Sequence, residues 1–61
     1  MAIAAEAWRL REAARKAILA GEFGRAWELA RGAQEAQATP AGETLVRLGA
    51  WLRASSVARD A

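Results

Sequence analysis

The fold is decided by residues 21–33, GEFGRAWELARGA, in which two glycines interrupt one helical run and a second run begins. Apolar residues in the second run recur every three or four positions, as on one face of an α-helix. A second break falls at Thr39-Pro40. Thr39 suits a helix N-cap, and Pro40 suits the first helical position, where its missing N–H has no partner to lose. The two breaks predict three helices and a frayed tail, at residues 2–20, 23–37, 40–57 and 58–61.

Composition supports an all-α fold. Alanine supplies 18 of the 61 residues, and most of the others are Leu, Glu, Arg and Gln, which are strong helix formers. β-branched residues are few, so strands have little support. Short connections place consecutive helices antiparallel. We therefore predict one domain, residues 1–61, folded as a three-helix antiparallel bundle.

Each predicted helix has a candidate core stripe. In the first helix it is Ile3, Ala7, Leu10, Ala14 and Ala17. In the second it is Phe23, Ala26, Trp27, Leu29, Ala30 and Ala33, and in the third it is Leu45, Leu48 and Leu52. Because small residues let two helix backbones approach closely, we expect a tight hairpin between the first two helices.

The order of small and aromatic residues resembles that of a tetratricopeptide repeat. Residues 21–33 fit G-x-F-x2-A-x3-A-x2-A, which looks like the second half of such a repeat. Residues 45–52, L-x2-L-G-x2-L, are similar to the W-x2-L-G-x2-Y pattern of its first helix, with Leu at both aromatic positions. Leu10 and Leu45 are 35 residues apart, close to the family period. The resemblance covers residues 7–53, about one and a half repeats, and implies a helix-turn-helix followed by a third helix.

The chain also departs from that pattern. Ala30 stands where the family has a large residue, and the first helix lacks both the Trp and the Gly. A microtubule-interacting-and-transport-like three-helix bundle shares the G-x-F/Y-x2-A signature and is one alternative. The other is a plain alanine-rich bundle in which small residues at these offsets serve packing alone.

Several large or charged residues lie off the core stripes. Trp and Arg are enriched at interface hot spots, and the repeat resemblance implies that the first helix lines a concave groove. The third helix has a further apolar side that no later helix would cover. The alternative interpretation is that the tryptophans are core and that single exposed Val or Ala residues are ordinary. The candidate partner-binding residues are Trp8, Arg11, Glu12, Arg15, Leu19, Val46, Ala50, Trp51 and Val57.

The chain has no Cys and no His, which removes disulfides, Cys/His zinc sites and the commonest catalytic base and nucleophile. We therefore expect no enzyme activity and no catalytic, cofactor-binding or metal-binding residues. A domain this small is marginally stable alone, so association with another chain is the expected source of further stability.

Charge gives weak support to a nucleic-acid partner. The net charge is only +2, and most arginines have a Glu three or four residues away, such as Arg25 and Arg31 with Glu28. No apolar run is long enough for a membrane span, and the N-terminus lacks a signal-peptide pattern, so we expect a cytoplasmic protein. The sequence favours a protein–protein interaction module, a homo-oligomer or small accessory subunit. Arginine-mediated nucleic-acid binding is the alternative.

Overall fold

The computed structural model describes the backbone of residues 2–60 and the side chains of residues 3–57. This part of the chain is all-α and folds into α1 (Ala2–Leu19), α2 (Phe23–Ala36) and α3 (Pro40–Asp60). The third helix runs three residues past the end predicted at residue 57. The segment predicted as a frayed tail is therefore helical as far as Asp60, and Ala61 lies outside the described residues.

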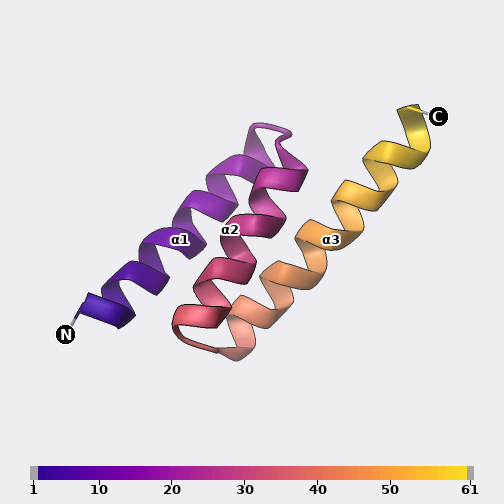
Figure 1. Cartoon of the computed structure of the whole chain (residues 1–61). Coiled ribbons are helices and arrows are strands. Elements are labelled where there is room, and N and C mark those ends of the chain that lie inside the picture. Colours follow the sequence, from indigo (N-terminus) through magenta and orange to yellow (C-terminus); the bar gives the residue numbers. More distant parts are fainter. Residues whose placement is uncertain (1, 61) are drawn as a thin grey trace.

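The three helices lie side by side, with α2 between α1 and α3 (Figure 1). The outer two run parallel to each other, antiparallel to α2, and touch each other only lightly. The molecule is elongated, with principal extents of 44 × 19 × 13 Å. Arg53 lies level with Gly24, near the start of α2, so the last two turns of α3 run beyond the hairpin.

The turn between α1 and α2 is a Schellman motif. The Gly21 N–H donates to the Ile18 carbonyl (3.0 Å), and the Glu22 N–H donates to the Ala17 carbonyl (2.8 Å). Gly21 has φ = +78°, in the left-handed region where a β-carbon is disfavoured. This glycine therefore ends α1 and reverses the chain.

The turn between α2 and α3 is built by side chains. The Thr39 hydroxyl accepts the Gly42 N–H at 2.9 Å, which makes Thr39 the N-cap, and Pro40 is the first residue of α3. The Thr39 N–H in turn donates to the Gln34 side-chain oxygen at 3.0 Å. Gln34 thereby ties the last turns of α2 to the start of α3.

The core is made almost entirely of alanine. The buried apolar residues are Ala7, Ala14, Ala17, Ala26, Ala30, Ala33 and Leu45. Among the described residues no large side chain is fully buried. The small side chains let α1 and α2 pack closely, as the sequence predicted, but they leave the larger apolar groups near the surface.

The core prediction is wrong at two residues. Ile3 is 54% exposed, because α1 has 18 residues and α2 only 14, and the first turn of α1 extends past the end of its neighbour. Leu48 is 41% exposed, because α3 packs on α2 through Leu45 and Gly49, and Leu48 lies to one side of that line. Leu52, the third member of that stripe, is half-buried.

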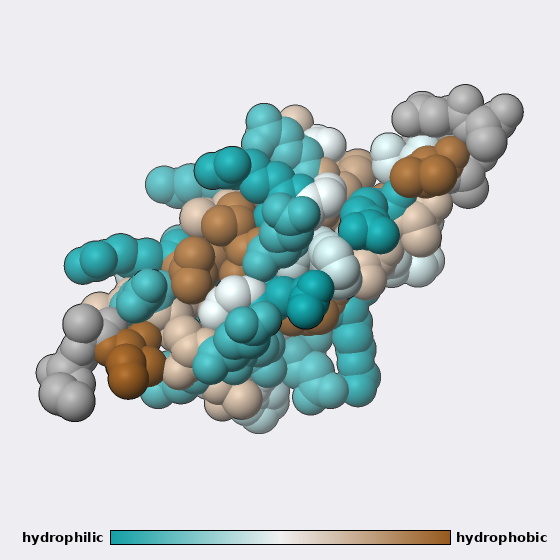
Figure 2. Space-filling model, in the orientation of Figure 1, coloured by the Kyte–Doolittle hydropathy of each residue, from teal (hydrophilic) through white to brown (hydrophobic). Residues whose placement is uncertain are grey.

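Hydrophobic residues on the face shown in Figure 2 form separate patches among hydrophilic ones, rather than one continuous band. Within residues 2–60, no helix combines the length and apolar character needed to cross a bilayer.

Candidate interaction surface

A shallow apolar groove of about 370 Å³ runs between α1 and α3. Its lining residues are Arg15, Ile18, Leu19, Leu45 and Leu48. Leu45 also belongs to the core, and Ile18 packs against it, so the floor of the groove is continuous with the folded interior. Leu19 is 89% exposed at the rim, which makes it the most exposed large apolar side chain described.

Two tryptophans extend this apolar area along its helices. Trp8 precedes Arg15 by seven residues, so both lie on the same side of α1. Trp51 follows Leu48 by three residues, and neighbours at this spacing lie on adjacent surface of a helix. Trp8 and Trp51 are 60% and 64% exposed. We call the surface formed by the groove and its extensions the α1–α3 face; its residues are Trp8, Arg15, Ile18, Leu19, Leu45, Leu48 and Trp51.

The charges on the α1 side of this face compensate each other. Arg15 forms an ion pair with Glu12, one turn earlier on α1. Both side chains are well exposed, so the pair contributes little to stability. Its effect is to leave the α1 side of the groove close to neutral.

Arg11, predicted as a partner-binding residue, is not among the residues that line the groove, and its side chain is directed to the end of α2. Its guanidinium donates to the backbone oxygen of Gln37 at 3.4 Å and to the Gln37 side-chain oxygen at 3.3 Å. Gln37 is the C-cap of α2. The cation therefore sits at the negative end of the α2 dipole, where it stabilises the hairpin.

The predicted uncovered side of α3 is not a single surface. Val46 is half-buried against the core and lines a groove between α2 and α3, so its prediction as an uncovered residue is wrong. Ala50 and Val57 are exposed, and their helical positions turn them away from both Leu48 and the groove. The candidate residues thus divide between the α1–α3 face, the end of α2, the α2–α3 groove and the outer side of α3.

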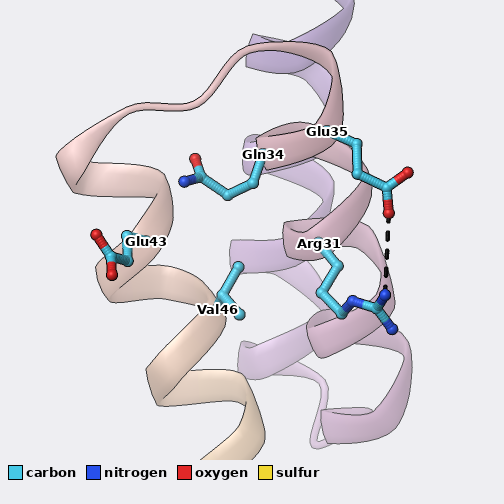
Figure 3. A pocket seen from close by; sticks show the side chains of 5 residues that line it. All are labelled: Arg31, Gln34, Glu35, Glu43 and Val46. Atoms are coloured by element: carbon cyan, nitrogen blue, oxygen red, sulfur yellow. Dashed lines mark ion pairs between the residues drawn. The ribbon is translucent and has the colours of Figure 1, made fainter.

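Polar or charged residues make up most of the lining of the α2–α3 groove, and most of them have partners (Figure 3). It measures about 390 Å³ and is lined by Arg31, Gln34, Glu35, Glu43 and Val46. Arg31 lies 4.0 Å from Glu35, and Glu43 lies 2.9 Å from Arg47. Gln34 extends from α2 towards α3, where its oxygen holds the turn. The Gln34 contact joins α2 to the start of α3, whereas the two exposed ion pairs each lie within one helix and contribute little to stability.

A tryptophan of α2 has two arginine side chains over its ring, one from α2 and one from α3. The Trp27 ring has the Arg31 guanidinium carbon 4.8 Å from its centre and that of Arg53 at 4.5 Å. Such contacts are attractive because the ring face is electron-rich. Sequence reasoning missed this cluster. The four-residue spacing of Trp27 and Arg31 was a usable signal, but Arg53 joins them only through tertiary packing.

Arginines in all three helices have interaction partners within the chain. The pairing predicted for Glu28 is wrong: Arg25 lies 4.0 Å from Glu22, and Arg31, held over Trp27, lies 4.0 Å from Glu35. The arginines with an intramolecular ionic, hydrogen-bonded or stacking partner are Arg11, Arg15, Arg25, Arg31, Arg47 and Arg53.

No family model, curated protein or solved structure matches this chain. In the part of the chain that the structure describes, no three metal-binding side chains gather at one place. The α1–α3 face is therefore identified as the candidate site from its geometry alone, because it is an apolar groove bordered by large exposed side chains.

Proposed function

We propose that the chain is a protein–protein interaction module that binds another polypeptide through the α1–α3 face, as a homo-oligomer or as a small subunit of a larger assembly. The observation that carries the proposal is the exposure of Trp8 and Trp51, both on this face, around a core of alanine. Tryptophan is the residue type most enriched at the energetic centre of protein interfaces.

The large apolar side chains on the α1–α3 face stay in contact with solvent, so they contribute less to stability than they would if they were buried. Full burial of a large apolar side chain contributes about 1.5–3 kcal/mol. Trp8, Leu19, Leu48 and Trp51 are each between 41% and 89% exposed. A partner that covers the face would recover much of that free energy, which is a large amount for a domain with a small core.

The proposal includes a repeat-like architecture. In a tetratricopeptide array the first helices of successive repeats line one groove and the second helices lie behind them. Here the parallel helices α1 and α3 both contribute to the apolar groove, and α2 packs against both. This arrangement supports a degenerate repeat hairpin followed by the first helix of a second repeat.

Nucleic-acid binding has less support. A nucleic-acid site needs cationic side chains gathered on one surface and free to contact phosphates. Arg15 and Arg47 are paired with carboxylates, and Arg53 is stacked on Trp27. These contacts favour structural roles for the arginines.

The proposal is tested by site-specific photo-cross-linking in cells that produce the chain. Trp51 or Trp8 is replaced by p-benzoylphenylalanine, one position at a time, and the control is Glu28, which is exposed on α2. We expect covalent adducts to another polypeptide from the two positions on the face and few from position 28. Equal yields at all three positions would contradict a binding role for the α1–α3 face.

A further inference from the structure

The solvent-accessible surface of the chain is larger than that expected for a compact protein of the same mass. A compact monomer of 6.5 kDa exposes about 3,800 Å², whereas this chain exposes 4286 Å². Its radius of gyration is 11.5 Å, against about 10.5 Å for a compact domain of this length. The difference arises because the molecule is elongated and the last two turns of α3 run beyond the hairpin.

The exposed apolar area on the α1–α3 face approaches the area that a stable dimer buries. Trp8, Leu19, Leu48 and Trp51 together expose on the order of 500 Å², given that one aromatic side chain can bury 150–250 Å². The polar rim around them, which includes Glu12 and Arg15, adds to this. A standard interface buries about 800 Å² on each partner.

The charge of the face favours a partner with an identical surface. In a two-fold dimer the same patch meets itself, so a patch with a large net charge would repel its copy. On this face Arg15 is paired with Glu12 within the same chain, and the other groove residues are apolar. The neighbouring cation Arg11 is directed to Gln37 at the end of α2. A strongly acidic or basic partner would find no excess of opposite charge there.

We propose that the occupant of the α1–α3 face is a second copy of this chain, which makes the protein a two-fold homodimer with the two apolar grooves facing each other. This inference rests on the proposed function and specifies its partner. The dimer packs helices of one copy against helices of the other, the usual way to bury an apolar face. Trp8, Leu19, Leu48 and Trp51 then form the centre of the shared core.

The test is sedimentation equilibrium of the full chain over a concentration series, with helicity followed by circular dichroism. We expect a monomer–dimer equilibrium. Trp51→Glu should raise the dimer dissociation constant by about thirtyfold or more, the effect of removing an interface hot spot. Leu19→Gln is a second variant, and because Leu19 is 89% exposed its replacement leaves the packed core unchanged.

The matched control is Val57→Glu, which also places a carboxylate on an exposed apolar position of α3 but lies off the α1–α3 face. We expect it to dimerise like the parent chain. A parent chain that stays helical and monomeric throughout the series overturns the inference. So does a dimer that Val57→Glu disrupts while Trp51→Glu and Leu19→Gln leave it intact.

The two proposals fail in different ways. A monomer in sedimentation whose position-51 cross-link joins it to a different polypeptide refutes the homodimer and leaves the interaction module standing. A monomer with no preferential cross-link at positions 8 and 51 refutes both. A cross-linked product of twice the chain's mass, together with a dimer sensitive to Trp51→Glu, supports both.

Discussion

Gly49 of α3 lies directly against the backbone of Trp27 in α2. A β-carbon at position 49 would stand 3.1 Å from the Trp27 Cα and 3.2 Å from its backbone nitrogen. These atoms belong to a packed helix and cannot rotate away as a flexible side chain would. The missing side chain therefore sets the distance between the two helices. That close approach also brings Arg53, one turn further along α3, within 4.5 Å of the Trp27 ring.

We expect Gly49→Ala to destabilise the fold by about 1–3 kcal/mol, the usual effect of overpacking a closely packed contact. The better helix propensity of alanine offsets only part of this, about 1 kcal/mol. Urea unfolding followed by circular dichroism measures the change, at one fixed protein concentration because association would shift the midpoint.

Gly32→Ala is the control for this substitution. A β-carbon at position 32 would meet only the Leu10 Cδ1 atom, at an ordinary 3.7 Å. We expect it to stabilise α2 by about 0.5–1 kcal/mol through helix propensity alone. Equal effects of Gly49→Ala and Gly32→Ala would show that the α2–α3 approach is looser than described.

Gly21→Ala should destabilise the chain by about 1–2 kcal/mol through backbone strain. Beyond the adjacent residues, no heavy atom lies within 4 Å of a β-carbon built at position 21, so tertiary contacts contribute nothing and the local strain of the positive φ decides the effect. Gly21→Asn should cost clearly less, since Asn tolerates the left-handed region better. Thermal unfolding of the two variants provides the comparison, and similar losses for Ala and Asn would refute the strain explanation.

Thr39→Ala should destabilise the fold by about 1 kcal/mol, because it removes the hydroxyl that caps α3. Thr44→Ala is the matched control: the Thr44 hydroxyl donates to the Pro40 carbonyl at 3.2 Å but lies on the exposed side of the helix. We expect a near-neutral effect there. Chemical denaturation separates the two, and a Thr39 variant as stable as the parent would contradict the capping role.

A double-mutant cycle with Trp27→Leu and Arg53→Gln should give a favourable coupling of about 0.5–1 kcal/mol between the ring and the guanidinium. The control cycle replaces Arg53→Gln by Arg47→Gln, whose side chain pairs with Glu43 instead. We expect no measurable coupling in the control. If both cycles give the same coupling free energy, the stacking contact is not its source.

The sequence alone determined the helices and their connections. Gly21 and Thr39-Pro40 act through their own backbone and nearest neighbours: a positive φ at one turn, and a side-chain cap with a fixed proline φ at the other. Local rules of this kind can be read without knowing what lies across the fold. The alanine stripe of α1 also followed from helical periodicity, since Ala7, Ala14 and Ala17 are buried as predicted.

Tertiary structure decided which residues of each predicted stripe are buried and which partners the neighbouring side chains have. Ile3 fits the periodicity of its stripe, yet it is exposed because α2 ends before reaching it. Arg11 belongs by sequence to the predicted partner-binding strip of α1, but the end of α2 supplies Gln37 as its acceptor. Helix phase fixes the direction of a side chain, whereas burial also needs a neighbouring helix at the same height. The relative heights and spacing of the three helices follow from long-range contacts such as Gly49 against Trp27, and no local pattern encodes them.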